Sequence, residues 1–359
     1  FLPDKIASGR ERDIRECIGC NICYASDSLG VPIRCTQNPT MGEDWRKGWH
    51  PENISPKQSG DSILVVGAGP AGLECARALG QRGYEVMLSE ARRELGGRVT
   101  LEARLPGLSE WARVRDHRIQ QLQAMTNVQV FPESELSADD VALVEPDHVV
   151  IATGSSWRKD GLGRSNTGGI SGLRAPSQMF TPDDIMAGRV PEGRVLVFDD
   201  DNYYMAPAIA ELLTATSPKV SYATPENLVA AFGAETAEQH ATQKRLMDLD
   251  IDLILAHNLE GFDGTAAVLS CSYSERSRTV PVDAIVMVTA RSPNETLYRE
   301  LTERLSGGGA GPVKSVRRIG DCDAPAIIAA AVYAGHRYAR EFDTADVDTY
   351  CTRRDRPEA

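Results

Sequence analysis

The segment 62–90 constrains the fold most, because it places a glycine-rich turn between a buried strand and a helix. Residues 63–66 form a continuous apolar run, as expected of a parallel strand covered on both faces. A helical pattern and a second strand, 85–88, follow the turn Gly67-Ala68-Gly69-Pro70-Ala71-Gly72. Such glycines permit a tight turn and let a pyrophosphate approach the helix N-terminus. Glu90, at the end of the second strand, is placed to accept hydrogen bonds from the ribose hydroxyls of an adenosine.

Four cysteines near the start of the chain have the spacing of iron–sulfur ligands. Cys17, Cys20 and Cys23 are separated by two residues each, and Cys35 follows after a further eleven. Three thiolates in one tight loop can occupy three corners of a cubane, and a short excursion of the chain supplies the fourth. Structural zinc sites usually pair Cys-x2-Cys with a second, distant pair, which is missing here. The spacing therefore predicts a 4Fe–4S cluster ahead of zinc, with unrelated buried thiols last.

The composition indicates a cytoplasmic redox protein. The chain has 359 residues, eight cysteines and a formal net charge of −12. Eight cysteines are too few for a disulfide scaffold of this length, and the cytoplasm keeps thiols reduced for metal binding. The acidic balance argues against nucleic acid and anionic membranes as partners. We find neither a signal peptide nor an apolar run of membrane-spanning length in the sequence.

Two later segments resemble the remaining nucleotide motifs of the flavoprotein disulfide-reductase superfamily. One is a strand that ends in Ala152-Thr153-Gly154, and the other leads into Gly320-Asp321 ahead of a helical stretch. The pair Gly96-Gly97 after Glu90 also fits that pattern. The superfamily inserts a second nucleotide domain within the first. The candidate nucleotide contacts are therefore Gly67, Gly69, Pro70, Ala71, Gly72, Glu90, Ala91, Gly97, Arg98, Ala152, Thr153, Gly154, Gly320 and Asp321.

The inserted domain is expected between Arg158 and Asp283 and begins with a strand at 194–198. A working NAD(P)H site would carry a glycine-rich turn next, but the chain has Asp199-Asp200-Asp201-Asn202-Tyr203-Tyr204. Three carboxylates would repel a pyrophosphate, and the two tyrosines would fill its space. We therefore expect the shape of a nicotinamide-binding domain without its chemistry. For the acidic loop itself, a solvated turn is favoured over a cation site.

Several rare motifs resemble the C-terminal part of one family, which contains trimethylamine dehydrogenase, dimethylamine dehydrogenase and N-methyl amine demethylases. The motifs span the chain: Cys35-Thr36-Gln37-Asn38, Gly48-Trp49-His50-Pro51-Glu52, Leu105-Pro106-Gly107-Leu108, Tyr204-Met205-Ala206-Pro207 and Gly335-His336-Arg337. The more distant 2,4-dienoyl-CoA reductases share the architecture but space their cysteines differently.

The resemblance implies an electron relay. Family members oxidise their substrate at FMN in an N-terminal TIM barrel and pass electrons through a 4Fe–4S cluster to an electron-transfer flavoprotein. Cys17, Cys20, Cys23 and Cys35 then correspond to the cluster ligands, and the first nucleotide domain binds ADP or FAD. No catalytic residue is carried over, because the reaction residues belong to the barrel. The full-length protein is expected to be a homo-oligomer.

The expected fold class is α/β, with an iron–sulfur segment followed by two nested Rossmann-like nucleotide-binding domains. Residues 1–14 resemble the tail of a barrel that is missing from this sequence. The expected parts are therefore 1–14 as that tail, 15–60 as the cluster segment and linker, 61–158 with 284–345 as the FAD- or ADP-binding domain, 159–283 as the degenerate insert, and 346–359 as a C-terminal tail.

Three functions remain open on sequence alone. The favoured one is the electron-relay part of an iron–sulfur flavoprotein that oxidatively demethylates or deaminates an N-methylated amine or betaine. The second is an FAD- and NAD(P)H-dependent reductase similar to 2,4-dienoyl-CoA reductase, against which the acidic turn argues. The third is a nucleotide-binding module with a structural zinc and no enzymatic activity.

Overall fold

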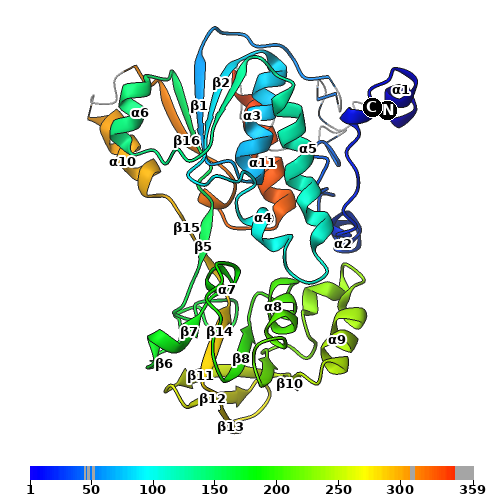
Figure 1. The fold of residues 1–359 in the computed structure, drawn as a ribbon, viewed down its shortest axis with the longest axis vertical. Helices are drawn as coiled ribbons and strands as arrows, with labels where there is room; N and C mark the ends of the chain where they lie inside the picture. The colour runs from blue at the N-terminus through cyan, green and yellow to red at the C-terminus, as the bar shows by residue number, and fades with distance from the viewer. Residues whose placement is uncertain (44–45, 47–48, 51–52, 308–311, 344–359) are drawn as a thin grey trace, which may run out of the picture. The chain divides into compact units, whose positions relative to one another are not determined.

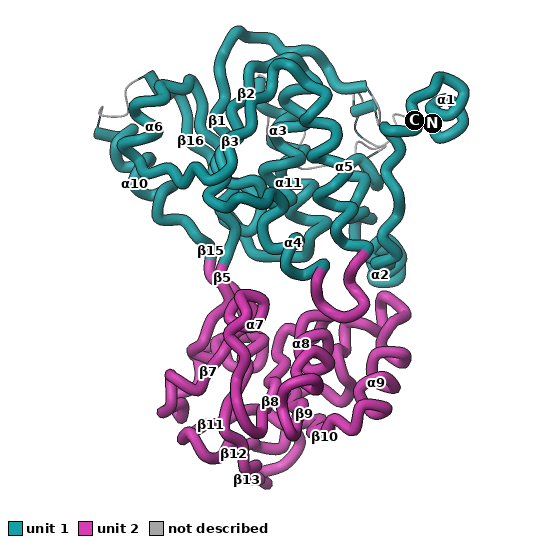
Figure 2. The backbone as a smooth tube through the Cα atoms, in the orientation of Figure 1, with its two compact units in different colours: residues 1–103, 110–155, 293–359 teal, residues 104–109, 156–292 magenta. Residues whose placement is uncertain are grey.

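Two units, each built on a parallel sheet, make up the chain (Figures 1 and 2). The computed structural model describes residues 1–43, 46, 49–50, 53–307 and 312–343. Unit 1 contains residues 1–103, 110–155 and the chain from 293 onward, and unit 2 contains residues 104–109 and 156–292. The expected tail 346–359, Cys351 and parts of the motif Gly48-Trp49-His50-Pro51-Glu52 lie outside the described residues.

A five-stranded sheet forms the centre of unit 1, in the order β16-β4-β1-β2-β3 with all pairs parallel. Its strands are β1 (Ser62–Val66), β2 (Glu85–Ser89), β3 (Val128–Phe131), β4 (His148–Ile151) and β16 (Ser315–Arg318). Val66 pairs with both Ser89 and Ile151, and Ile151 pairs with Arg318. The carboxyl ends of these four strands are therefore level at one edge of the sheet.

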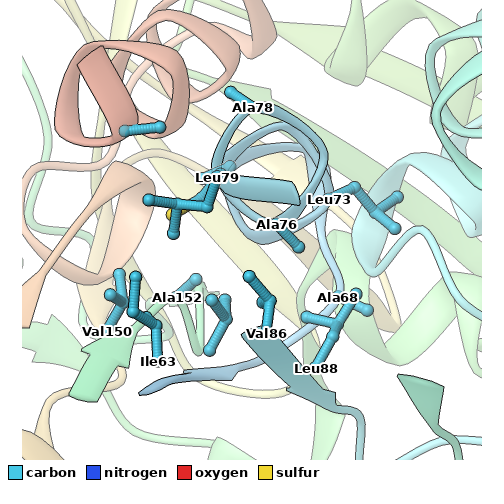
Figure 3. Close-up of a cluster of buried hydrophobic side chains, with 14 of the residues drawn as sticks. Ile63, Ala68, Leu73, Ala76, Ala78, Leu79, Val86, Leu88, Val150 and Ala152 are labelled. Carbon is cyan, nitrogen blue, oxygen red and sulfur yellow. The ribbon is translucent and has the colours of Figure 1, made fainter. Parts of the chain in front are cut away.

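Alternate residues of β1 enter different hydrophobic cores, which confirms a strand buried on both faces. Ile63 and Val65 lie in the core that contains α3 (Pro70–Arg82), as Figure 3 shows for Ile63. Leu64 and Val66 lie in a second core, with residues of α6 (Ala138–Val144) and α10 (Thr296–Ser306). Helices thus cover both faces of this sheet. This arrangement removes from water the apolar side chains of β1 that follow Ser62.

The helices α3 and α11 (Ile328–Glu341) approach each other closely at a glycine. A Cβ atom on Gly335 would lie 2.1 Å from the carbonyl oxygen of Ala71 and 3.0 Å from the amide nitrogen of Cys75. Any side chain at position 335 would therefore push the two helices apart. The motif Gly335-His336-Arg337 thus has a packing explanation at its first position.

Unit 2 has three layers. Its parallel sheet has the order β10-β9-β8-β14-β7, and a second sheet of order β13-β12-β11-β6 packs on one face. Val195 and Val197 of β8 (Arg194–Asp199) enter the core shared with α8 (Met205–Leu213). Leu196 and Phe198 enter the core shared with the second sheet.

The remaining elements complete the two units. Unit 2 further contains α7 (Pro182–Met186), α9 (Gln239–Asp248), β6 (Gly172–Leu173), β7 (Met179–Phe180), β9 (Lys219–Ala223), β10 (Asp252–Ile254), β11 (His257–Phe262), β12 (Ala266–Cys271), β13 (Ser277–Pro281) and β14 (Ala284–Val288). Unit 1 further contains α1 (Leu2–Ala7), α2 (Ile22–Ser28), α4 (Arg98–Glu102) and α5 (Ala112–Gln123). The chain leaves unit 1 through β5 (Ser155–Trp157) and returns through β15 (Arg291–Pro293), which pair with each other. Short 3-10 turns occur at Glu11–Asp13, Ser109–Trp111, Pro176–Gln178, Ala231–Ala234 and Gly320–Cys322.

Most sequence-based strands and helices agree with these bounds. The strands expected at 62–66, 85–88 and 194–198 correspond to β1, β2 and β8. The segment 104–109, expected in the first nucleotide domain, instead groups with unit 2, where Leu105 and Leu108 pack against the core that contains α8. In the part of the chain that the structure describes, every helix is too short or too polar to cross a bilayer.

We predict that Gly335→Ala destabilises the protein by about 1–3 kcal/mol, the usual cost of overpacking a close contact. Urea denaturation measures the loss of unfolding free energy. Gly60→Ala is the matched control, because no atom of the described residues lies within 4 Å of a Cβ at that position. Equal effects of the two substitutions would contradict the close helix contact.

Candidate nucleotide site and cysteine segment

The predicted nucleotide contacts gather at one edge of the unit 1 sheet. Gly67 follows β1, Glu90 follows β2, Ala152 follows β4, and Gly320 lies two residues after β16. Parallel pairing brings the carboxyl ends of these strands together, as the register above shows. In open α/β sheets ligands bind outside the carboxyl ends of the strands.

The glycine turn after β1 packs tightly on one side and is open on the other. Gly67 has a φ of +101°, and a Cβ there would lie 2.5 Å from the carbonyl oxygen of Ala152. A Cβ on Gly72 would lie 1.9 Å from the carbonyl oxygen of Gly67. Around Gly69 and Gly154, by contrast, nothing among the described residues lies within 4 Å of a Cβ. The open positions leave room for a ligand to reach the backbone.

The helix α3 begins at this turn and can receive an anion. Gly69 is its N-cap residue, no described side chain caps it, and Pro70 occupies the first turn. The 13 residues of α3 align their peptide dipoles toward the turn, so that the free N–H groups of its first turn favour negative charge. The residues present therefore fit the pyrophosphate of ADP or FAD.

Glu90 is buried and already accepts two backbone hydrogen bonds. Its Oε2 accepts from the amide of Ala68 at 2.8 Å, and its Oε1 accepts from the amide of Arg92 at 3.0 Å. These bonds fix the carboxylate at the end of β2 beside the glycine turn. Each carboxylate oxygen retains acceptor capacity, so that ribose hydroxyls remain suitable donors. The neighbouring Ala91 is exposed.

Arg98 and Asp321 meet through a serine that sequence reasoning missed. Ser155 Oγ donates to Asp321 Oδ2 at 2.9 Å, and Arg98 donates to the carbonyl oxygen of Ser155. The Arg98 guanidinium also lies 3.6 Å from Asp321 Oδ2. Gly97, which precedes Arg98, has a φ of +57°, and a Cβ there would lie 3.0 Å from the Cα of Gly69. Gly97 of the Gly96-Gly97 pair therefore lies against the glycine turn that follows β1.

A second missed group surrounds Thr153. Its hydroxyl donates to the carbonyl oxygen of Asn294 at 2.6 Å, and Asn294 Nδ2 donates back to the carbonyl of Thr153 at 3.1 Å. The buried thiol of Cys322 lies 3.3 Å from the same hydroxyl. Asn294 lies more than a hundred residues from Thr153 in sequence, and only the fold joins them.

The four cysteines lie in unit 1 ahead of β1, with Cys17 exposed and Cys20, Cys23 and Cys35 half-buried. The amide of Gly19 donates to Cys17 Sγ and the amide of Asn38 to Cys35 Sγ, each at 3.3 Å. Amide donors around the sulfurs suit thiolate ligands of a cluster.

Burial raises the pKa of the Cys20 thiol, the Thr36 hydroxyl at 3.1 Å lowers it, and Cys35 and Cys17 raise it further. The three cysteines therefore interact electrostatically. In the described part of the chain, no three His, Cys, Asp or Glu side chains form a group that could hold a metal ion. The cysteines of a cubane each bind a different iron, and four thiols on one segment supply the type and number of ligands that such a cluster needs.

A buried carboxylate ties the cysteine segment to the nucleotide-binding helices. Glu74, on α3, accepts from Arg77 at 2.6 Å, Arg118 at 2.9 Å and His336 at 2.9 Å, and is fully buried. Arg118 also donates to the side chain and the carbonyl oxygen of Gln37, at 3.2 and 3.1 Å. Since Gln37 lies two residues after Cys35, the network joins the cysteine segment to α3, α5 and α11.

The charge states in this network follow from burial and neighbours. Burial alone would raise the pKa of Glu74, but Arg77, Arg118 and His336 together hold it well below its ordinary value. Burial lowers the pKa of His336 to about 4, against the opposing effect of Glu74. The neutral imidazole donates through Nδ1 to Glu74 and accepts through Nε2 from Arg340 at 3.1 Å.

A second set of charged groups anchors the same segment. The guanidinium of Arg34, directly before Cys35, lies 4.0 Å from the ring centre of Tyr333 and 2.8 Å from Glu43. Arg46 donates to Glu341 at 2.9 Å. Tyr333 and Glu341 both belong to α11. The cysteine segment is thus held at several points by long-range ion pairs and hydrogen bonds.

The acidic turn of unit 2 is not solvated, and the expectation of a solvated turn was wrong. Asp199 and Asp200 are both fully buried. Asp199 Oδ1 accepts from the amides of Asp201 and Asn202, at 3.1 and 2.8 Å, and its Oδ2 accepts from the hydroxyl of Tyr222. Asp200 accepts from the amide and the hydroxyl of Ser165, at 2.9 and 2.8 Å. Burial is tolerated because both carboxylates have donors.

Asp199 uses the amides that a bound phosphate would need. In a nucleotide-binding turn, N–H groups after the first strand face the pyrophosphate. Here the chain supplies its own carboxylate, and the buried ring of Tyr203 packs edge-on against Tyr204 and Phe232, at centroid distances of 4.7 and 5.1 Å. Burial raises the pKa of Asp199 to about 7, against the lowering effect of Tyr222.

Comparison with known proteins agrees with this architecture. Residues 61–179 match the family described as pyridine nucleotide-disulphide oxidoreductase, and residues 180–264 match the OYE-like second alpha/beta domain. Dimethylamine dehydrogenase of Hyphomicrobium sp. is 37% identical over 372 residues, covering 96% of this chain and 50% of its own length. A probable N-methylproline demethylase of Rhizobium meliloti is 29% identical over 94% of this chain and 51% of its own length.

Two solved structures are similar over nearly all of the chain. Histamine dehydrogenase from Rhizobium sp. 4-9 superposes with a TM-score of 0.95 and 45% identity, covering all of this chain and 55% of that one. The 6-hydroxypseudooxynicotine amine oxidase of Pseudomonas geniculata has a TM-score of 0.91 and 41% identity, covering 96% of this chain and 51% of that one.

The fold and the site define an α/β protein of the disulfide-reductase type with a second, inserted domain. The chain belongs to the trimethylamine and dimethylamine dehydrogenase-like family and corresponds to its C-terminal part. This confirms the resemblance inferred from the motifs. The chain spans about half the length of the curated relatives it matches.

We predict that Arg118→Met destabilises the protein by about 3–5 kcal/mol, because it leaves the buried Glu74 carboxylate short of positive charge. Urea denaturation measures this loss. Arg299→Met is the control, since Arg299 is exposed and pairs with Glu295 on the surface, and it should change stability little. A loss below about 1 kcal/mol for Arg118→Met would contradict the role of the pair.

We predict that Asp199→Asn becomes more stabilising, relative to the native chain, as the pH rises from 4 to 7. The native pKa of about 7 exceeds the ordinary value of 3.8, so the folded chain binds the extra proton in this interval. The contribution of Asp199 to stability therefore falls as the pH rises, whereas the asparagine cannot ionise. Urea midpoints at pH 4.5 and pH 8 measure the change, expected to exceed about 1 kcal/mol. A difference that does not vary with pH would overturn the assignment.

Proposed function

We propose that this chain is the electron-relay part of an iron–sulfur flavoprotein that oxidises an amine at a carbon next to nitrogen. The names of its relatives support the substrate class, because they act on dimethylamine, N-methylproline and histamine. Within that class we favour an N-methylated amine or betaine, which the full-length protein demethylates or deaminates. The reaction site belongs to the FMN barrel expected in the rest of the protein.

The cysteine segment packed on the nucleotide-binding helices carries this proposal. Cys35 lies between Arg34, which stacks on Tyr333 of α11, and Gln37, which accepts from the buried Arg118 of α5. A 4Fe–4S cluster held by Cys17, Cys20, Cys23 and Cys35 would accept and release single electrons there. The chain's own part is to bind and orient the ligands, to supply amide donors to their sulfurs, and to hold the segment against a rigid helical layer.

Exposure of Cys17 fits an electron exit toward a partner. Cys17 is exposed while the other three cysteines are partly covered. Electron transfer between proteins needs a short path from cofactor to surface, and the exposed ligand provides one. We propose an electron-transfer flavoprotein or a similar acceptor as the partner, with the full-length protein as a homo-oligomer in the cytoplasm.

The nucleotide site in unit 1 is proposed to bind the ADP moiety of ADP or FAD. Gly67, Gly69, Gly72 and the N-terminus of α3 suit its pyrophosphate, and Glu90 suits its ribose. Gly154 and Gly320-Asp321 line the same strand edge. ADP and FAD share these groups, and both fit.

An NAD(P)H-dependent reductase is the second candidate. An NADH oxidase of Thermoanaerobacter brockii is 33% identical over 52% of this chain, which favours it. The turn after β8 counts against it, because Asp199 takes the amides of Asp201 and Asn202 and Tyr203 is buried beside them. We therefore favour the electron-relay function over an NAD(P)H-dependent reductase.

The test is the metal content and visible spectrum of the anaerobically purified chain. We predict iron and acid-labile sulfide at about four each per chain, and a broad band that dithionite bleaches. Cys20→Ala should lose the cluster, because one ligand is removed. Cys271→Ala is the matched control, since Cys271 lies in β12 of unit 2, and it should keep the metal.

Three outcomes would change the assignment. Zinc without sulfide would favour the nucleotide-binding module over the relay. Full iron in the Cys20→Ala variant would contradict the ligand set. Rapid bleaching by NADH or NADPH would favour the reductase, whereas resolved flavin bands without such bleaching would identify FAD as the nucleotide.

A further inference from the structure

His117, in the middle of α5, is half-buried and has two shielded ring nitrogens that the proposed relay does not yet use. Both of its ring nitrogens are shielded from solvent and have no hydrogen-bond partner among the described residues. Buried polar side-chain atoms almost always have a partner, so each exception needs an explanation. A missing bound group is one such explanation.

The helix geometry shows what His117 faces. Arg113, four residues earlier, donates to the carbonyl oxygen of Cys17 at 3.5 Å and lies 3.2 Å from Glu16. Gln121, four residues later, donates to Asp13 at 3.1 Å. Residues four apart lie on one face of a helix. His117 therefore lies on the face of α5 that contacts the segment 13–17, between the contacts to Asp13 and to Cys17.

The charges near His117 also place it beside the cysteine segment. Burial, followed by the positive charges of Arg15, Arg118 and Arg77, lowers the pKa of His117 to about 3. Arg15 lies two residues before Cys17 and donates to Asn38, three residues after Cys35, at 3.1 Å. An imidazole carries at least one N–H donor in either protonation state. Arg15 therefore links the part of the segment that contacts this face of α5 to the part that follows Cys35.

We propose that His117 donates its ring N–H to a sulfur of the bound cluster, at the Cys17 end of the segment. This inference rests on the proposed function, because it requires the cluster. A hydrogen bond to a cluster sulfur stabilises the added negative charge of the reduced form, and so raises the reduction potential. His117 is then a positioning residue that tunes the relay. The adjacent Arg118 faces Gln37 from the same helix, so that α5 supports both ends of the segment.

The first measurement uses the native chain with its cluster. Protein labelled with ¹⁵N-histidine is reduced with dithionite, and pulsed EPR records nitrogen couplings to the reduced cluster. We expect a weak coupling from one imidazole that is absent in His117→Leu. The reduction potential, from an EPR-monitored titration, should shift to lower values in His117→Leu, and His117→Asn or His117→Gln should restore part of the shift because an amide can donate.

The matched control is His240→Leu, because His240 is an exposed residue of α9 in unit 2. It should keep the native potential and the native nitrogen coupling. An unchanged potential in His117→Leu with full iron would overturn the inference. If that variant loses iron, the native coupling decides, and its absence would overturn the inference equally. A native chain without iron and sulfide would instead overturn the proposed function.

Discussion

The buried carboxylate of Glu74 is the interaction on which unit 1 depends. A charge at that depth is stable only when it is paired and fully hydrogen-bonded. Arg77, Arg118 and His336 meet this requirement from α3, α5 and α11. Because Arg118 extends the network to Gln37, the cysteine segment is fixed by the same charge that holds the helical layer together. The cysteine segment and the helices α3, α5 and α11 are therefore joined by one network of charged groups.

The parallel sheets of unit 1 and unit 2 have corresponding strand-to-helix turns, and these two turns differ in their hydrogen bonding. In unit 1 the turn after β1 is open around Gly69, and no described side chain caps α3. In unit 2 the corresponding turn after β8 is closed by Asp199, whose carboxyl group accepts hydrogen bonds from the amides of Asp201 and Asn202. The first arrangement leaves the N-terminus of α3 open to a ligand, whereas in the second a side chain of the chain itself occupies the amides. This contrast explains why one site is proposed to hold a nucleotide and the other is not.

Local patterns predicted the strands and the glycine turns, because their signals are contained within short stretches of sequence. The apolar run 63–66, the turn after it and the acid at position 90 required no knowledge of distant residues. The pairings of Glu74 with His336 and of Arg118 with Gln37 could not be predicted, since they join residues 262 and 81 positions apart. The solvated reading of Asp199 failed for a related reason. Its partner Tyr222 lies 23 residues further along the chain, in the neighbouring strand β9, and local sequence patterns do not show this donor.

The close contact at Gly335 also determines how near α11 lies to α3. A Cβ at position 335 would lie 2.1 Å from the carbonyl oxygen of Ala71, so that α11 can pack this closely on α3 only with a glycine there. The glycine therefore sets the distance between the two helices at this point. Since α11 also carries His336, Tyr333 and Glu341, the same distance affects the position of three side chains whose interactions hold the cysteine segment. The absence of a side chain at position 335 thus affects how the proposed nucleotide site and the proposed cluster site are spaced within unit 1.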